Sequence, residues 1–494
     1  MLKRERFFPG FNHILCGNPP KSALAQLKEK FEDFRQSSLS ELSDLFDSLV
    51  PSSKLQAKED KENSRERIYS LNVTFWAFLH QVISPRTSCR EVVRRVQSFC
   101  SHRGLEIPSS ESTAYCKARQ RLPIEDLNSI HEAVVEKVQG RVRDEQRWKG
   151  HDIKVMDGTG ITLADTPENQ ELFPQPSSQL PGCGFPVLKM VACFCLSSGA
   201  LLKWVETNLK SHESRILQQF LGFFGTNDVV LTDRGFTSYS NIGLLIEQGV
   251  NLVMRAHQAR NIDYRTGVRL GRYDRLMTWV KPQRQKGWTK DDWAALPDTI
   301  QLRAVRIFIA VKGFRVRQYD LVTTLTDHEI YTVDDLADLY YQRWAVELFF
   351  RHIKTTMGME QLRCKTPPMV RKELQMFIIA YNLIRALMQE AATRHSCDLD
   401  RLSFKATIDT LRDFRIALIA TTNQPRTYQR IIDEMFQVFA SELVPLRMNR
   451  SEPRALKKRP KPFQRLMCHR SKFKVSKSRK NKGKPKPKNV VNTA

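Results

Sequence analysis

VVLTDRG, residues 229–235, is a short aliphatic run that ends in an aspartate, an arginine and a glycine. IKVMDGTG, residues 153–160, has a similar form, with Asp157 after a short apolar run. Such runs predict β-strands, and glycine beside an acid predicts a turn. If the two strands lie side by side and parallel, Asp157 and Asp233 emerge together at the sheet edge where α/β folds bind ligands. Turn formation by either aspartate alone is the alternative interpretation.

The alternation of strand and helix patterns around these motifs predicts an α/β fold. Residues 186–196 and 200–209 are expected to pair as strands, and residues 238–248 to form a helix before a strand at 250–256. β-Branched residues and turns dominate residues 257–329, so this segment is expected to be a β-rich insertion. The predicted order along the chain is a helical domain (1–145), the first part of the core (146–256), the insertion (257–329), the second part of the core with C-terminal helices (330–445) and a basic disordered tail (446–494).

Two helices are predicted inside the N-terminal domain, at 72–83 and 89–100, joined by a short turn. Ser88 and Glu91 have the spacing of a capping box, which predicts the start of the second helix. Such a pair fits either a DNA-reading helix-turn-helix or an ordinary bundle, and both interpretations stay open. Three basic residues that follow are candidate phosphate contacts, with a solvated face as the alternative: Lys117, Arg119 and Arg121.

The charge of the chain indicates a polyanionic partner. The 494 residues include 79 Lys and Arg against 53 Asp and Glu, a net charge of +26. Residues 451–494 contribute +15, which leaves +11 for the body of the chain. A cationic surface releases counterions from DNA, so nucleic acid is the leading partner, and an anionic membrane surface is the weaker one. The Lys- and Pro-rich tail cannot bury a core and is expected to be disordered.

The sequence argues against a membrane protein and against a secreted one. It has no apolar run of the ~18–20 residues that a spanning helix needs, and its N-terminus lacks the apolar core of a secretory signal. The ten cysteines form no CxxC pairs. Buried thiols in a reducing compartment are therefore expected, including Cys193 and Cys195, rather than disulfides or a zinc site. The expected location is the cytoplasm.

YYQRWAVELFFRHIK, residues 340–354, predicts a helix that is crowded with bulky apolar side chains but carries a polar stripe. At 100° per residue, Tyr340, Arg343, Glu347 and Lys354 fall within an arc of about 60°. Large apolar groups flank this arc closely, so the stripe is narrower than an ordinary solvated face. The stripe is therefore a candidate functional site, and a solvated helix face is the alternative.

The two aspartates and Glu347 together suggest one chemistry. Three carboxylates can chelate two Mg²⁺ or Mn²⁺ ions about 3.5–4 Å apart, which activates a hydroxyl nucleophile and stabilises the leaving oxygen of phosphoryl transfer. Arg343 and Lys354 beside them would bind phosphates. The sequence has no GxxxxGK[ST] motif, so coupling to ATP is not expected.

The spacing Y-x2-R-x3-E-x6-K from Tyr340 to Lys354 resembles the signature of bacterial DDE transposases of the insertion-sequence-four group. Asp157 in DGT and Asp233 in TDRGF match the first and second acids of that family, and Glu347 matches the third. The resemblance covers roughly residues 70–390 and shows no departure at the three acids.

This resemblance implies a ribonuclease-H-like catalytic core with a β-rich insertion, in a bacterial, nucleoid-associated protein. It implies two-metal cleavage of DNA at terminal inverted repeats, with Mg²⁺ or Mn²⁺, followed by joining of the 3′-hydroxyl ends to target DNA. It also implies that the N-terminal helices recognise the ends and that two protomers assemble on paired ends. Some relatives use a hairpin intermediate and stack a flipped base on a tryptophan of the insertion. The candidates here, with core packing as the alternative, are Trp279, Trp288 and Trp293.

Four residues near the acids are candidates for DNA contact: Tyr340, Arg343, Lys354 and Arg234. Arg234 either touches phosphate or pairs with an acid, and Tyr340 either donates to a phosphate or packs the helix. Two other functions stay open, a two-metal nuclease that cuts without joining and a non-catalytic DNA-binding protein derived from a transposase. Joined products would separate a transposase from a nuclease. Loss of an acid would favour the non-catalytic protein, and all three acids are present.

Overall fold

The structure, a computed structural model, describes most of the chain between residues 45 and 445. The described residues are 45–46, 48–55, 68–84, 87–102, 106–209, 216–257, 260–285, 287–309, 317–421, 424–445, 466–469 and 472. The prediction of a disordered tail therefore falls almost entirely outside the described residues. Within these ranges, no helix is both long enough and apolar enough to cross a membrane.

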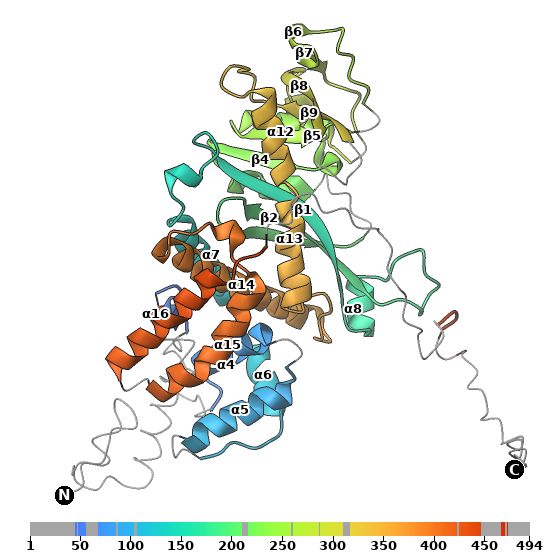
Figure 1. The fold of residues 1–494 in the computed structure, drawn as a ribbon. Helices are drawn as coiled ribbons and strands as arrows, with labels where there is room; N and C mark the ends of the chain where they lie inside the picture. Colours follow the sequence, from blue (N-terminus) through green and yellow to red (C-terminus); the bar gives the residue numbers. More distant parts are fainter. Residues whose placement is uncertain are drawn as a thin grey trace, which may run out of the picture.

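The described strands form one nine-stranded sheet in the order β3-β2-β1-β4-β5-β9-β8-β7-β6. β1, β4 and β5 are parallel to one another, and the remaining neighbours are antiparallel. With helices packed around the sheet, the fold is mixed α/β, as predicted (Figure 1). The strands are β1 (Asp152–Thr162), β2 (Val187–Cys195), β3 (Leu201–Thr207), β4 (Asp228–Thr232), β5 (Asn251–Arg255), β6 (Val268–Gly271), β7 (Asp274–Val280), β8 (Thr299–Ile309) and β9 (Arg317–Thr323).

The strand that carries Asp157 is longer than the sequence pattern predicts. β1 continues through Gly158 and Gly160 to Thr162, so the expectation that Asp157 ends its strand is wrong. The physical reason is antiparallel pairing with β2, which holds Gly158 opposite Val191 and Gly160 opposite Lys189. The parallel pairing of β1 with β4 ends at Val155, before Asp157, whereas its antiparallel pairing with β2 continues past Asp157.

The predicted N-terminal helix pair is confirmed as α4 (Leu71–Ile83) and α5 (Cys89–His102). The capping box is also confirmed, since the Glu91 carboxylate accepts from the Ser88 backbone N–H and the Ser88 hydroxyl accepts from the Glu91 N–H. α4 is buried along nearly its whole length and packs on α5 and on the C-terminal half of the chain. The pair is thus built into a bundle, at the end of the molecule opposite β6–β9 (Figure 1).

The remaining helices complete this bundle and cover the sheet. α14 is the central one, and it packs on α4, α7, α15 and α16. The bounds are α6 (Thr113–Arg121), α7 (Ile124–Gln139), α8 (Pro167–Leu172), α10 (Tyr239–Glu247), α11 (Lys290–Ala295), α14 (Pro367–Arg394), α15 (Phe404–Thr421) and α16 (Pro425–Ser441). α12 and α13 belong to the candidate site.

Arg119, a candidate phosphate contact, is part of the bundle core instead. Its side chain is buried, donates to the Gln81 side-chain oxygen at 3.3 Å and lies over the ring of Phe78 at 4.7 Å. Desolvation of an arginine is tolerated where its charge meets aromatic faces and hydrogen-bond acceptors. Lys117 and Arg121 are exposed on the same helix.

The segment 257–329 is β-rich, as predicted, but it continues the core sheet. β9 pairs with β5, with Val253 opposite Thr323, so the added strands and the core strands share one set of hydrogen bonds. Of the three tryptophan candidates, Trp279 and Trp293 are buried, and Trp288 is partly exposed with its ring 5.6 Å from that of Trp293.

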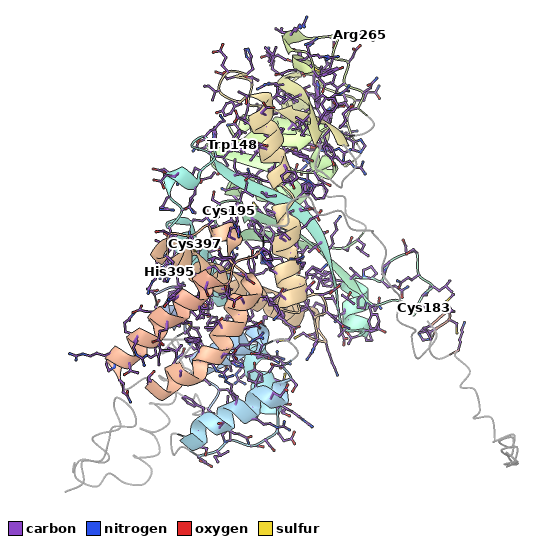
Figure 2. All side chains as sticks on the ribbon, viewed as in Figure 1. Trp148, Cys183, Cys195, Arg265, His395 and Cys397 are labelled. Atoms are coloured by element: carbon purple, nitrogen blue, oxygen red, sulfur yellow. The ribbon has the colours of Figure 1, made fainter. Side chains whose placement is uncertain are left out.

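The nine cysteines among the described residues are free thiols. Cys183 lies far from Cys195 and Cys397 (Figure 2). Cys193 and Cys195 are both buried on β2. The prediction of buried thiols is therefore confirmed for this pair.

His131 should make the stability of the protein depend on pH. This residue of α7 is buried with Nε2 3.0 Å from the Leu201 carbonyl oxygen, and burial lowers its pKa to about 4. As the pH falls, His131 of the unfolded chain therefore binds a proton near pH 6.5. In the folded chain the same residue binds it only near pH 4. The free energy of unfolding should fall as the pH drops from about 6.5 toward 4, by up to about 1.4 kcal/mol per pH unit.

Urea unfolding at pH 7 and pH 5 checks this prediction. His131→Gln keeps a donor for Leu201 but cannot titrate, so the pH dependence should be smaller in this variant. His328→Gln, at an exposed position, is the matched control. An unchanged pH dependence in His131→Gln would contradict the assignment.

Candidate active site

The helix predicted over residues 340–354 is interrupted. α12 (Val333–Gln342) ends before Arg343, α13 (Ala345–Arg351) begins after Trp344, and a π-helix follows at His352–Thr356. Around the break, the backbone N–H groups of residues 343, 344, 346 and 347 bond to carbonyls three residues earlier. This tighter winding changes the direction of each side chain, so the arc drawn on an ideal α-helix does not hold.

Burial separates the members of the predicted polar stripe. Tyr340 is 2% exposed and Arg343 is 7% exposed, whereas Glu347 is an exposed residue and Lys354 is half-buried. Burial raises the pKa of Tyr340 to about 12, so its hydroxyl stays protonated and can donate a hydrogen bond.

Aromatic packing holds α13 against the sheet. Phe194 of β2 places its ring 5.4 Å from that of Phe349 and 5.2 Å from that of Phe350, and the ring of Tyr381 on α14 lies at 6.2 Å. Such pairs each contribute about 0.5–1.5 kcal/mol beyond the area they bury. The apolar residues of the sequence stretch therefore fix the helix that carries Glu347.

Arg343 and Lys354, which precede and follow Glu347 in the sequence, both contact β1. Arg343 Nη1 lies 3.6 Å from Asp157 Oδ2, and Lys354 Nζ donates to the Thr159 hydroxyl at 3.0 Å. Asp157 and Thr159 are two residues apart on a strand, so they lie on the same face of the sheet. α13 packs on β1, and Glu347 lies one turn after Arg343.

The parallel pairing of β1 and β4 ends two residues before each aspartate. Val155 lies opposite Leu231, so Asp157 and Asp233 both follow the last residues of this pairing at the same edge of the sheet. Each aspartate has one oxygen held by a backbone N–H. Gly158 N–H donates to Asp157 Oδ1 at 2.7 Å, and Gly235 N–H donates to Asp233 Oδ1 at 2.8 Å.

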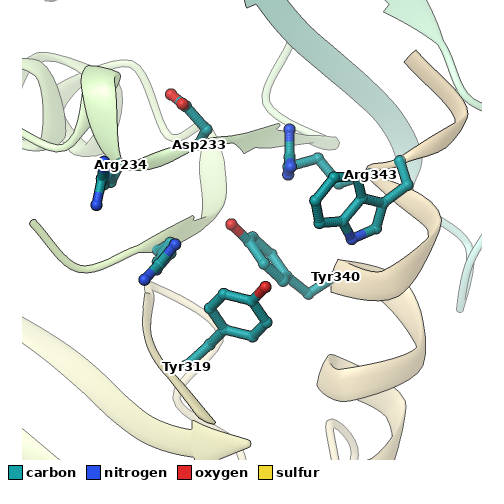
Figure 3. Close-up of a pocket in the computed structure, with 7 residues that line it drawn as sticks. Asp233, Arg234, Tyr319, Tyr340 and Arg343 are labelled. Carbon is teal, nitrogen blue, oxygen red and sulfur yellow. The ribbon is translucent and has the colours of Figure 1, made fainter. Parts of the chain in front are cut away.

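Asp233 lines a cavity of about 210 Å³ between the strand ends and the helix. Figure 3 shows Tyr340 and Arg343 entering from the helix, while Asp233 and Arg234 come from the opposite side. A volume of this size holds several waters or a phosphate group, since one water takes about 30 Å³.

Three residues of this cavity escaped the sequence prediction: Arg255, Tyr319 and Trp344. Arg255 could have been found, because Thr232 lies opposite Met254 and the next residues in this register are Asp233 and Arg255. Tyr319 comes from β9, whose pairing with β5 has no local signal. Arg255 lies over the Tyr319 ring at 4.5 Å.

The carboxylates fit a hard divalent ion in chemical type, since such ions prefer oxygen ligands. Oδ2 of Asp157 already faces a positive charge, that of Arg343. Among the described residues, however, no three His, Cys, Asp or Glu side chains are gathered closely enough to hold a metal ion. Asp157 and Asp233 each follow the β1–β4 pairing, and Glu347 lies on α13, which packs on β1.

Comparison with known proteins shows a similarity to transposases. A family described as "Transposase DDE domain" matches residues 148–383. The transposase InsG of insertion sequence element IS4 from Escherichia coli (strain K12) is 25% identical over 426 residues, which cover 85% of this chain and 92% of InsG. This chain is similar to the DDE transposases of the IS4 group over most of its length.

A second transposase relative comes from Geobacillus stearothermophilus. This probable transposase for the insertion sequence element IS5377 is 27% identical over 40% of this chain and 49% of its own length. Among solved structures, a cryo-EM structure of the piggyBac transposase synaptic complex with hairpin DNA covers 83% of this chain and 84% of its own, at 10% identity and a TM-score of 0.38. That similarity is too low to support an argument.

Proposed function

We propose that this chain is a transposase that cleaves DNA at the ends of an insertion sequence and joins the 3′-hydroxyl ends to target DNA. The observation that carries the proposal is the β1–β4 pairing, which both Asp157 and Asp233 follow by two residues, with the helix of Glu347 packed on β1. The order β3-β2-β1-β4-β5, with three antiparallel strands followed by two parallel ones, supports a ribonuclease-H-like core. We also propose the domain boundaries predicted from the sequence, with the core divided by the insertion at 257–329.

In this proposal, Asp157, Asp233 and Glu347 hold two Mg²⁺ or Mn²⁺ ions. Bound ions would activate the attacking hydroxyl and stabilise the leaving oxygen. Arg343 and Lys354 bind DNA near the scissile phosphate, and Arg234 and Tyr340 contact DNA at the cavity. The partners are the terminal inverted repeats and target DNA, held by two copies of the chain.

A cleavage and joining assay tests this function. A plasmid carrying the DNA that flanks the gene is incubated with the full chain and Mg²⁺ or Mn²⁺, and ends and junctions are sequenced. Cut ends with joined junctions support a transposase. Cut ends alone would assign the two-metal nuclease instead, and bound but intact DNA would assign a non-catalytic binding protein.

Deleting residues 451–494 should weaken DNA binding and flatten its salt dependence. The segment carries 16 Lys and Arg against one acid. Every phosphate that the shortened chain no longer neutralises should reduce the slope of log K against log salt by about 0.9. Fluorescence anisotropy over a range of salt concentrations measures both quantities.

The same deletion should leave the selectivity for the ends of the element unchanged. The truncated chain should still prefer terminal-repeat DNA over unrelated DNA, because the N-terminal helices are proposed to recognise the ends. Loss of this preference together with the tail would contradict that assignment.

A further inference from the structure

Two cysteines of the helical bundle meet where α5 begins beside α6. Cys89 is the first residue of α5, and Cys116 lies in the first turn of α6. The Cys116 thiol donates a hydrogen bond to the Cys89 sulfur, and both side chains are half-buried. A disulfide bond is about 2.05 Å long, so two sulfurs that are already in contact need to move little to form one.

Gln81 of α4 gives Cys89 a second hydrogen-bond donor. Its Nε2 atom donates to Cys89 Sγ at 3.7 Å and to the Thr87 carbonyl at 3.2 Å. Its Oε1 atom accepts from the Tyr115 hydroxyl at 2.9 Å and from Arg119 Nη1 at 3.3 Å. Because both of these donors act on the oxygen, they fix the orientation of the amide and keep its N–H groups toward the cysteine.

The surroundings of Cys89 favour its thiolate form. The hydrogen bond from Cys116 lowers the pKa of the Cys89 thiol more than partial burial raises it. The Arg119 guanidinium and the Gln81 amide lower this pKa further. Cys89 also lies at the N-terminus of a 14-residue helix, where the helix dipole stabilises a negative charge. The thiolate is the form of cysteine that reacts with oxidants.

We propose that Cys89 and Cys116 form a thiol–disulfide switch that responds to hydrogen peroxide. The Cys89 thiolate attacks one peroxide oxygen, the O–O bond breaks, and hydroxide leaves a sulfenic acid on Cys89. The Cys116 sulfur then attacks the Cys89 sulfur, the S–O bond breaks, and the thiol proton leaves with the hydroxyl group as water. Counting the proton that Cys89 gave up, one peroxide is reduced to two waters while two thiols are oxidised to one disulfide.

The disulfide would join α5 to α6, which lie side by side (Figure 1). Each cysteine is followed by an exposed cation, Arg90 on α5 and Lys117 on α6, so the bond would fix the spacing of these two charges. In a reducing compartment such a bond is short-lived, which suits a switch rather than a permanent cross-link. The inference concerns the bundle alone and does not depend on the proposed function.

Peptide mapping of the oxidised full chain tests the switch. The chain is first reduced with a dithiol, then treated with hydrogen peroxide, digested without reductant and analysed by mass spectrometry. Peptides cross-linked between Cys89 and Cys116 are expected, and a reductant should separate them. Cys364 is the competing thiol, since it is buried close to Cys89. A chain without a cross-link, or one with Cys89 bonded to Cys364, would overturn the proposal.

Hydrogen exchange tests whether the bond fixes the two helices. Amide exchange in α5 should slow by at least about threefold in the cross-linked chain, because α5 can then no longer open independently of α6. Addition of a reductant should restore the faster exchange. An unchanged exchange rate in the cross-linked chain would overturn the switch.

Cys116→Ser separates the two chemical steps. Serine keeps a hydroxyl donor beside Cys89 but cannot close the bond, so Cys89 should stop at the sulfenic acid, which dimedone traps. Cys397→Ser is the matched control, because it removes another half-buried thiol, one whose pKa is raised by burial, and should leave the cross-link unchanged. Equal dimedone labelling of Cys89 and Cys397 in the Cys116→Ser chain would overturn the assignment of Cys89 as the reactive thiol.

Alkylation of the wild type keeps the inference testable if the serine variant does not fold. Iodoacetamide should modify Cys89 at least about tenfold faster than Cys397 in the folded chain at pH 7, because it reacts with the thiolate. Equal rates at the two cysteines would overturn the proposal.

Discussion

Glu347→Gln should abolish both cleavage and joining of DNA while leaving DNA binding close to that of the wild type. Glutamine keeps the size of this exposed side chain but removes its charge, and a neutral amide is a weak ligand for a hard divalent cation. A loss of at least about 10³-fold in rate is expected for a group that acts at the reacting centre. Gel assays of cut and joined plasmid, with anisotropy on the same preparations, measure both properties.

Glu360→Gln is the matched control for this variant. Glu360 is also exposed, and it follows the π-helix outside the proposed metal site. The Glu360→Gln variant should cut and join DNA like the wild type. Equal activity in the Glu347 and Glu360 variants would return Glu347 to the alternative interpretation, a solvated helix face.

Local patterns were sufficient for the strand that leads to Asp233 and for the helix that carries Glu347. β4 ends where an aliphatic run meets Asp-Arg-Gly, because acids and glycine favour turns over buried strands. α13 is helical because Val346, Phe349 and Phe350 bury one side of it against the sheet. Both features depend on residues close together in the sequence.

Features that depend on distant partners were not predictable from local patterns. Gly158 and Gly160 suggest a turn after Asp157 until their antiparallel partners on β2 are known. The tight turn at Arg343 interrupts a stretch that is helical on both sides, and it brings Arg343 to Asp157 on β1. Tyr319 reaches the cavity only because β9 pairs with β5.

Asp274→Ala should destabilise the protein by about 3–5 kcal/mol, the usual effect of removing one partner of a buried ion pair. Arg303 is fully buried, and its Nε and Nη2 atoms bond to the two oxygens of Asp274 at 2.9 and 2.6 Å. Without Asp274 the guanidinium would remain buried and uncompensated. Urea unfolding of the single variant at pH 7 measures this destabilisation.

The comparison with a double variant separates the buried charge from the change in packing. Asp274→Leu combined with Arg303→Met removes both charges while keeping apolar volume, so it should be considerably more stable than Asp274→Ala and approach the wild type. Asp263→Ala, which breaks an exposed pair with Arg265, should change stability little. A double variant as unstable as the single one would contradict the charge argument.

The same ion pair should influence the active site at a distance. Arg303 Nη1 also donates to the Tyr331 carbonyl, directly before α12, so β8 is tied to the start of the helix that leads to Tyr340 and Arg343. In Asp274→Leu combined with Arg303→Met, which removes this donor, joining activity should therefore fall below that of the wild type at temperatures where both remain folded. Equal activity of the two would show that this pair stabilises the sheet without positioning α12.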